Sequence, residues 1–228
     1  MKSHLKRLAM PRSWLARKKD NKYIIRPHPG GIDKELSISL QVLLRDVLKI
    51  VKTAKETRYV LTNKEMLVNK RRRREPKFPV SFMDTVSAPE GGWAYRMTLD
   101  KKGKLVPAEI DEKEAGTLLC KITGKTKVPG GKIQLNFMDG SNIMIDKDVY
   151  KTGDVVVLKD GKPDSHIKLE KGNLALIVSG KHVGEIGTIE DIQKDKIIVK
   201  DESGEVFETS RDYAFMVGKD KPLVTLRR

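Results

Sequence analysis

The sequence contains very little cysteine and no long apolar run, and these absences limit the class of protein. Cys120 is the only cysteine among 228 residues, which excludes an intrachain disulfide and argues against a cysteine-based zinc site. No run of about 18 apolar residues occurs, so we expect no transmembrane helix. Residues 1–7 lack a hydrophobic signal core, so we expect a protein of a reducing, cytoplasmic compartment.

Aromatic residues and catalytic motifs are also scarce. Aromatic residues make up 5% of the chain, and proteins that read single-stranded RNA usually stack its bases on aromatic rings. The composition therefore favours recognition of folded RNA by its backbone and shape. The four histidines (His4, His28, His166 and His182) are far apart and lack the spacing of a metal site. No nucleophile elbow, dinucleotide fingerprint or pair of catalytic carboxylates is recognisable, so we predict no enzymatic activity, no metal and no cofactor.

The formal net charge of +15 is concentrated at one end of the chain. The first 80 residues hold 22 Lys and Arg against 7 Asp and Glu, whereas the remaining 148 residues hold 24 of each sign. A basic segment of this kind binds a polyanion by releasing condensed counterions, before any base is read. An anionic membrane surface is the alternative partner, which we disfavour because no strongly amphipathic apolar face accompanies the charge.

Residues 1–38 combine scattered cations with prolines and glycines that interrupt any long helix. We predict an extended arm that becomes ordered on its partner, and the alternative is a disordered, solubilising tail. Apolar residues such as Leu5, Trp14 and Ile24 favour the arm. The cations that we expect to follow RNA grooves are Lys6, Arg7, Arg12, Arg17, Lys18 and Lys19.

A helix–turn–helix–strand unit follows the arm. Apolar residues with helical periodicity predict a first helix over residues 39–52, whose basic face would carry Arg45, Lys49 and Lys52. The sequence Thr53-Ala54-Lys55-Glu56 is typical of a capping box and predicts a second helix to about Leu61, before a short strand at 66–68. The second helix offers no Asn or Gln for adenine contacts, so it is a poor DNA reader.

The run Lys70-Arg71-Arg72-Arg73-Arg74 is the strongest local signal. Five adjacent cations repel one another unless a counter-charge is present, and guanidinium groups can bind phosphates bidentately. We therefore predict that this run and Lys77 bind RNA phosphates. The alternatives are a solvated loop or a targeting signal.

Short strands separated by glycine turns dominate the chain from Trp93 onward. Residues 92–170 predict one small all-β domain, a barrel or a sandwich, in which Cys120 is a core residue. Residues 171–217 predict a second β unit, with glycines at 180, 184 and 187 in a tight loop. Lys181 and His182 lie in that loop and are a second predicted RNA contact, whereas a plain barrel turn without a partner is the alternative.

Several stretches together resemble the S4e family of small-subunit ribosomal proteins. They are His4-Leu5-Lys6-Arg7-Leu8-Ala9 with Pro11-Arg12 and Trp14, Leu43-Leu44-Arg45-Asp46 with Leu48-Lys49, Lys77-Phe78-Pro79-Val80 with Phe82-Met83-Asp84, and Gly180-Lys181-His182-Val183-Gly184-Glu185-Ile186-Gly187, which resembles the core of a KOW motif. Members usually carry Asp-Gly where Asn69-Lys70 stand, so the chain departs from the family at this turn.

The resemblance implies an α+β multidomain protein of the ribosome. Its predicted parts are a basic arm (1–38), an S4-type RNA-binding domain (39–91), a central β domain (92–170), an SH3-like KOW barrel (171–217) and a tail (218–228). The implied partners are small-subunit ribosomal RNA and neighbouring ribosomal proteins, with no membrane and no small-molecule substrate. Two other functions stay open, namely an RNA-modifying enzyme, which would need a catalytic domain, and a transcription elongation factor, which should lack the arm and the helix pair.

Overall fold

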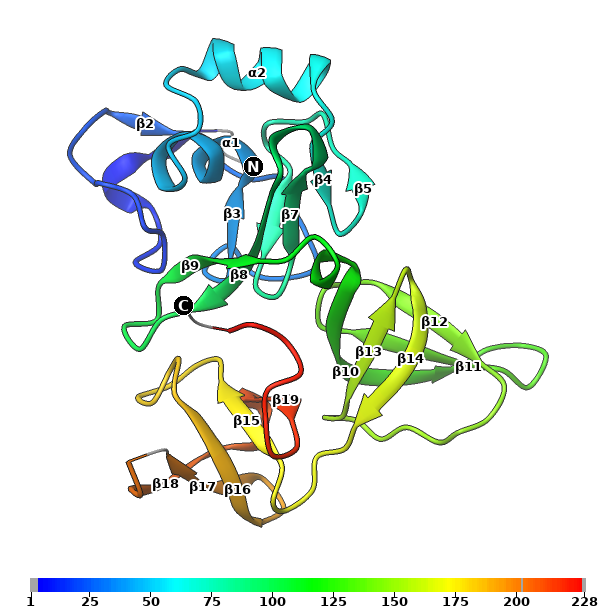
Figure 1. The fold of residues 1–228 in the computed structure, drawn as a ribbon. Helices are drawn as coiled ribbons and strands as arrows, with labels where there is room; N and C mark the ends of the chain where they lie inside the picture. Colours follow the sequence, from blue (N-terminus) through cyan, green and yellow to red (C-terminus); the bar gives the residue numbers. More distant parts are fainter. Residues whose placement is uncertain (1–3, 202, 227–228) are drawn as a thin grey trace. The chain divides into compact units, whose positions relative to one another are not determined.

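The computed structural model describes residues 4–201 and 203–226, which form two compact units. The first unit comprises residues 4–98, 104–116 and 226, and the second comprises residues 99–103 and 117–225. Both units consist mainly of β-strands with few helical segments (Figure 1). The ends of the predicted arm and tail, residues 1–3 and 227–228, lie outside the described residues.

The segment predicted as an extended arm is folded into the first unit. Strand β1 (Leu5–Lys6) pairs with β2 (Tyr23–Ile24), and a 3₁₀ turn η1 (Arg7–Ala9) follows β1. Trp14 is 2% exposed, and its indole Nε1 donates a hydrogen bond to the carbonyl oxygen of Ser37 at 2.8 Å. Met10, Trp14 and Ile24 are buried in the unit, so part of this segment is folded without a partner, whereas Leu8, Leu15 and Tyr23 are exposed.

The first predicted helix is shorter than its periodicity indicates. Its α-helical part α1 (Leu40–Val42) continues into a π-helical turn η2 (Leu43–Val47), in which the Leu48 amide donates to the Leu43 carbonyl at 2.8 Å. Lys49 adopts a left-handed conformation with φ of 57°, and this ends the helix. The predicted end at residue 52 was wrong, so Lys49 and Lys52 do not lie on a helical face.

The second helix, α2 (Ala54–Asn63), begins as predicted. The Thr53 side chain accepts from the Glu56 amide at 3.1 Å, and the Glu56 carboxylate accepts from the Thr53 amide at 3.4 Å, which forms a capping box. These reciprocal bonds satisfy donors that the first helical turn leaves without partners. Local side-chain chemistry was therefore sufficient to predict where α2 begins.

A mainly antiparallel sheet in the order β5-β4-β7-β8-β9 forms the centre of the first unit. Its strands are β4 (Leu67–Val68), β5 (Arg71–Arg72), β7 (Thr85–Ala88), β8 (Trp93–Leu99) and β9 (Leu105–Ile110). A second pair consists of β3 (Ser37–Ser39) and β6 (Pro79–Ser81), and 3₁₀ turns lie at η3 (Pro89–Gly91) and η4 (Glu114–Gly116). Strand β8 extends this sheet, because it pairs with β7 across Val86 and Tyr95.

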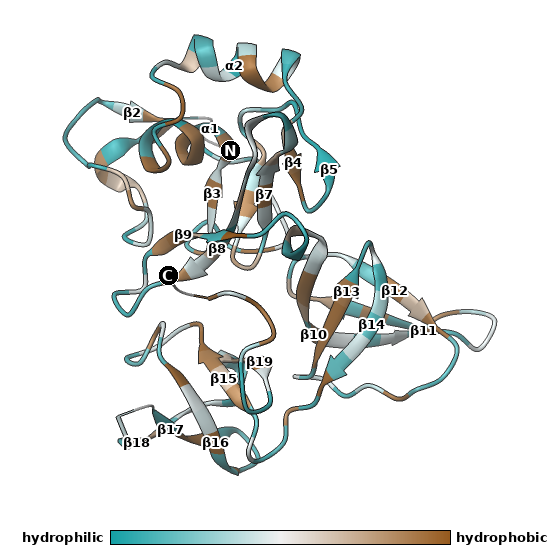
Figure 2. Ribbon diagram, in the orientation of Figure 1, coloured by the Kyte–Doolittle hydropathy of each residue, from teal (hydrophilic) through white to brown (hydrophobic). Residues whose placement is uncertain are grey.

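The buried side chains of the first unit come from both the helices and the strands. Ile38, Leu43, Leu61, Val86 and Met97 are fully buried. Figure 2 shows that hydropathy differs between neighbouring strands of the sheet. Strand β4 is hydrophobic, whereas β5, which carries two arginines, is hydrophilic. The apolar positions therefore fix the sheet and leave the arginine-bearing strand at its edge.

The second unit contains two five-stranded sheets. The first has the order β12-β11-β10-β13-β14, with β10 (Thr117–Lys127), β11 (Ile133–Phe137), β12 (Asn142–Ile145), β13 (Val155–Lys159) and β14 (Lys162–Ile167). Its apolar cluster includes Cys120, Ile122, Phe137 and Val156, so Cys120 is a buried core residue as expected.

The second sheet of this unit has the order β18-β17-β16-β15-β19. Its strands are β15 (Leu174–Ile177), β16 (Ile186–Ile192), β17 (Lys196–Asp201), β18 (Val206–Ser210) and β19 (Ala214–Gly218), with a 3₁₀ turn η5 (Arg211–Tyr213) before β19. Strand β19 was not expected from the sequence. The Lys121 ammonium on β10 donates to the carbonyls of Asp212 and Ala214 at 2.7 and 2.8 Å and so joins the two sheets.

Candidate nucleic-acid interface

A short hairpin presents the arginine run. Strands β4 and β5 pair through Leu67 with Arg72 and Val68 with Arg71, and Asn69 and Lys70 form the turn. Both turn residues are left-handed, with φ of 51° and 59°. The side chain of Asn69 stabilises the turn, because its Nδ2 donates to Asp84 Oδ1 at 2.7 Å. The missing glycine therefore does not abolish the hairpin, although a lysine occupies a strained position.

The arginines of the run have different surroundings. Arg71, Arg72 and Arg74 are exposed, whereas Arg73 is half-buried. The Nη2 atom of Arg72 donates to the carbonyl oxygen of Thr62 at 3.2 Å, at the carboxyl end of α2, where a cation is favourable. The same Nη2 atom also donates to the Lys64 carbonyl at 3.5 Å, so the Nε and Nη1 donors of Arg72 stay available to a ligand.

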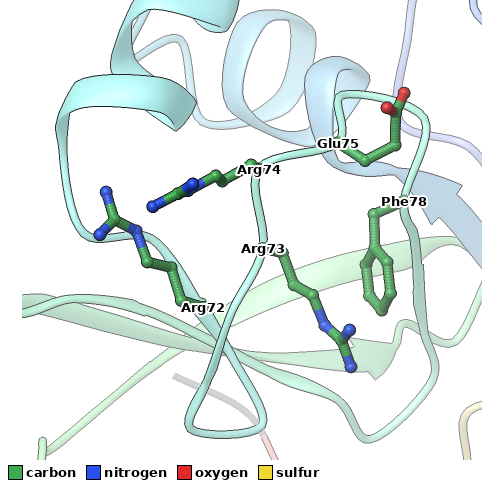
Figure 3. Close-up of a pocket in the computed structure, with 5 residues that line it drawn as sticks. All are labelled: Arg72, Arg73, Arg74, Glu75 and Phe78. Carbon is green, nitrogen blue, oxygen red and sulfur yellow. The ribbon is translucent and has the colours of Figure 1, made fainter.

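Arg73 packs against an aromatic ring on the neighbouring turn. Its guanidinium carbon lies 4.4 Å from the centroid of Phe78, within the range of a cation–π contact. Together with Arg72, Arg74 and Glu75, these two residues line a hollow of about 490 Å³ (Figure 3). The sequence analysis did not select Phe78 as a site residue, although it stands beside the selected Lys77.

Few carboxylates neutralise this region. Glu75 accepts from the Lys77 amide at 3.2 Å and lies 3.7 Å from His28 Nε2. Glu90 lies 2.8 Å from Lys64, and this hydrogen-bonded ammonium lowers the pKa of the Glu90 carboxyl. Both acids are already engaged, so the exposed arginines retain a net positive potential.

The remaining predicted cations of the first unit fall into two groups. Lys6, Arg12, Arg17, Lys18, Lys19, Lys49, Lys52, Lys70 and Lys77 are exposed. Arg7 is buried, with a side chain that is 1% exposed. Its guanidinium lies 3.7 Å from Asp46, and its Nε donates to the Arg17 carbonyl. Arg45 is half-buried and pairs with Asp46 at 2.8 Å. The prediction of Arg7 as a direct RNA contact was therefore wrong for this structure.

Three exposed side chains on α2 were not selected from the sequence. Lys55, Arg58 and Tyr59 are exposed, and Tyr59 is 65% exposed, which is unusual for a large aromatic residue. Their spacing of three and four residues brings them onto one face of the helix. The helical periodicity that predicted α2 could have identified this basic and aromatic face.

The glycine loop belongs to the second unit. Lys181 is exposed, whereas His182 is half-buried and stacks on Phe207 with ring centroids 4.0 Å apart and an interplanar angle of 8°. The His182 Nδ1 atom lies 2.9 Å from Glu185 Oε2. Of the two predicted contacts in this loop, only Lys181 is an exposed cation, because the His182 ring is already packed and hydrogen-bonded.

Neither a metal site nor a membrane-spanning helix occurs in the described part of the chain. No group of three His, Cys, Asp or Glu side chains within residues 4–201 and 203–226 could hold a metal ion. No helix in these residues is long and apolar enough to cross a membrane.

Comparison with known proteins defines the class of the chain. Models of three families match, namely the RS4NT (NUC023) domain over residues 1–31, Ribosomal family S4e over residues 92–161, and the KOW motif over residues 171–200. The chain is therefore a multidomain protein of S4e type that carries a KOW motif.

Individual relatives agree with this class over nearly the full length. The small ribosomal subunit protein eS4 of Methanothermobacter thermautotrophicus is 40% identical, over 99% of this chain and 96% of that protein. The eS4 protein of Methanospirillum hungatei is 42% identical, over 98% of this chain and 97% of that protein. The crystal structure of the 30S ribosomal protein S4e from Thermoplasma acidophilum matches with a TM-score of 0.69 and 34% identity, over 81% of this chain and 96% of that one. The chain belongs to the ribosomal S4e family, which confirms the resemblance drawn from the sequence.

Proposed function

We propose that this protein is a structural constituent of the small ribosomal subunit that binds ribosomal RNA and thereby supports translation. Family membership supports the ribosomal role, since the relatives at about 40% identity are named as small-subunit proteins. The proposed RNA contact rests on one observation. The β4–β5 hairpin and the residue pair after it expose Arg71, Arg72 and Arg74, and fewer carboxylates than arginines line this surface. We propose no enzymatic role, and the partners would be small-subunit RNA and neighbouring ribosomal proteins at the ribosome.

The proposed contact set is narrower than the one predicted from the sequence. It consists of the exposed cations and of half-buried Arg73, because these can reach a ligand without breaking an internal ion pair. The set is Lys6, Arg12, Arg17, Lys18, Lys19, Lys49, Lys52, Lys70, Arg71, Arg72, Arg73, Arg74, Lys77 and Lys181. Arg7 and Arg45 are omitted because they pair with Asp46, and His182 is omitted because it stacks on Phe207 and bonds to Glu185.

The finer architecture is part of the same proposal. We assign residues 39–91 to an S4-type RNA-binding domain and residues 171–217 to an SH3-like KOW barrel. The antiparallel order β18-β17-β16-β15-β19 supports a small barrel of this kind. We assign residues 92–170 to the central β domain, in which Lys121 of β10 donates to the Asp212 carbonyl of the KOW segment.

Salt-dependent binding to small-subunit RNA tests the proposed interface. Replacing Arg71, Arg72, Arg73 and Arg74 by Ala should weaken binding and flatten the plot of log affinity against log salt concentration, by about 0.9 per lost phosphate contact. The matched control replaces four exposed lysines of the second unit, Lys127, Lys162, Lys194 and Lys219, by Ala, which removes the same charge. An equal slope change in both variants would show that net charge alone, and not the hairpin, accounts for binding. A tagged protein that sediments apart from small subunits would contradict the ribosomal role.

A further inference from the structure

The hollow beside the arginine run has two rigid walls. One wall is the β4–β5 hairpin, in which the Arg73 amide donates to the carbonyl of buried Met66 at 2.9 Å. The other wall is the turn at residues 75–78, whose Phe78 carbonyl accepts from the Leu40 amide at 2.9 Å, at the start of α1. The hollow has a volume of about 490 Å³ and is widely open to solvent. Its walls are held by backbone hydrogen bonds, so an unpaired base can reach them from outside.

Consecutive arginines point to opposite sides of the chain. Figure 3 shows Arg72 and Arg74 extending together on one side, whereas Arg73 extends on the other side next to Phe78. This alternation follows from the extended backbone, in which residues two apart share a face. The run therefore offers two different kinds of contact within one segment.

The side with Arg72 and Arg74 is suited to bind an anion. Two guanidinium groups on one face repel each other, and no ion pair is formed by either of them within the described residues 4–201 and 203–226. The Glu75 carboxylate points away from them in Figure 3 and is bonded to the Lys77 amide. A phosphodiester supplies the missing charge and fits the forked donors of arginine.

The side with Arg73 and Phe78 provides a stacking surface. The guanidinium carbon of Arg73 lies over the Phe78 ring, 4.4 Å from its centroid, and the Arg73 Nε atom is buried without a hydrogen-bond partner. An arginine whose plane is fixed in this way can stack its other face on a nucleobase. Stacking of this kind tolerates any base, because every base has a π face.

We propose that this segment captures unpaired ribosomal RNA, with a phosphate bound by Arg72 and Arg74 on one side of the chain and the base of one unpaired nucleotide stacked on Arg73 in the hollow on the other side. The inference rests on the proposed function, since RNA supplies both the phosphate and the base. A base inside a continuous duplex is stacked on its neighbours and cannot enter the hollow, so the nucleotide lies in a bulge or loop.

The test uses the full-length protein bound to small-subunit ribosomal RNA of its own organism. Acylation of the RNA 2′-hydroxyls, read at single-nucleotide resolution, should reveal one unpaired nucleotide that the wild type protects. Arg73→Lys keeps the charge but loses the planar surface, so it should lose this protection and bind about tenfold more weakly at an unchanged salt slope. Arg74→Gln should instead lower the salt slope by about 0.9. Lys127→Gln, an exposed cation of the second unit, is the matched control and should leave the protected nucleotide unchanged.

The outcomes separate this inference from the proposed function. Failure of the wild type to bind the RNA would overturn the proposed function itself. Binding with protection confined to continuous duplex, or an Arg73→Lys protein that still protects the same nucleotide, would overturn the nucleotide pocket alone. Phe78→Leu is the independent second variant, and it should reproduce the loss caused by Arg73→Lys. Thermal unfolding of each variant establishes that only folded proteins are compared.

Discussion

The Nη2 atom of Arg7 lies 3.7 Å from Oδ1 of Asp46, and the arginine side chain is 1% exposed. The same guanidinium lies 3.6 Å from Asp20 and donates to the carbonyl of Arg17. These contacts join the first residues of the chain to the π-helical turn 39 positions later. Arg7 therefore stabilises the first unit, even though it belongs to the most basic part of the sequence.

Replacing Arg7 should destabilise the protein far more than replacing its exposed neighbour. Arg7→Met leaves Asp46 with one fewer partner in a partly buried position, so we expect a loss of about 2–4 kcal/mol in the free energy of unfolding. Lys6→Met should change it by less than about 0.5 kcal/mol, because Lys6 is exposed. Urea denaturation followed by circular dichroism measures both. Equal midpoints for the two variants would show that the Arg7 pairs contribute nothing to stability.

Features set by neighbouring residues were predicted well from the sequence. The capping box at Thr53 and Glu56 depends only on residues three apart, and α2 begins where it was expected. The change to short strands at Trp93 was expected, and β8 begins at that residue, because apolar residues and flanking turns are local signals. The composition likewise identified the arginine run, and the family comparison confirmed the resemblance.

Features set by distant contacts could not be predicted. The sheet to which β8 belongs depends on its pairing with β7, which strand propensity does not specify. The burial of Arg7 depends on Asp46, so a count of cations includes it among the RNA contacts. Phe78 became a site residue only when folding placed Arg73 over its ring. The candidate site was therefore predictable as a basic segment, but its hollow was not.

Substitutions of Lys70, in the strained turn of the hairpin, should change protein stability and RNA binding separately. Lys70 has a φ of 59°, which costs a residue with a Cβ about 1 kcal/mol relative to glycine. Lys70→Gly should therefore be about 1 kcal/mol more stable than Lys70→Ala, since both variants lose the same ammonium. Both should reduce the salt dependence of RNA binding equally. Thermal unfolding measures the first difference, and a glycine variant no more stable than the alanine variant would contradict the strained turn.

A glycine in the KOW loop is fixed by a close backbone contact. Gly184 has a φ of +78°, and a Cβ built on it would lie 2.2 Å from the carbonyl oxygen of Asp100. Gly172 has a similar φ of +87° but open space around its Cβ position. Gly172→Ala should cost about 1 kcal/mol from the backbone conformation alone, whereas Gly184→Ala adds the clash and should cost several kcal/mol. Chemical denaturation measures both, and similar losses would mean that the loop moves away from Asp100 without cost.

The buried ammonium of Lys121 should make the stability of the second unit depend on alkaline pH. Burial lowers the pKa of Lys121 to about 8, from an ordinary value of 10.5. Below pH 8 the lysine is protonated in both the folded and the unfolded chain, so its desolvation penalty is fully present. Between pH 8 and 10.5 the unfolded chain binds the additional proton, so the folded state gains up to about 1.4 kcal/mol per pH unit as the pH rises.

Lys121→Met removes this titration and provides the comparison. We expect the free energy of unfolding of the wild type, minus that of the variant, to rise by about 2 kcal/mol between pH 7 and pH 9.5. Taking the difference cancels the titration of the exposed lysines, and it also cancels any constant loss from the carbonyls of Asp212 and Ala214 that Lys121 no longer bonds. Urea denaturation at several pH values measures the difference. A constant difference across this range would mean that Lys121 keeps an ordinary affinity for its proton, and that its two carbonyl acceptors fully offset the cost of burying the charge.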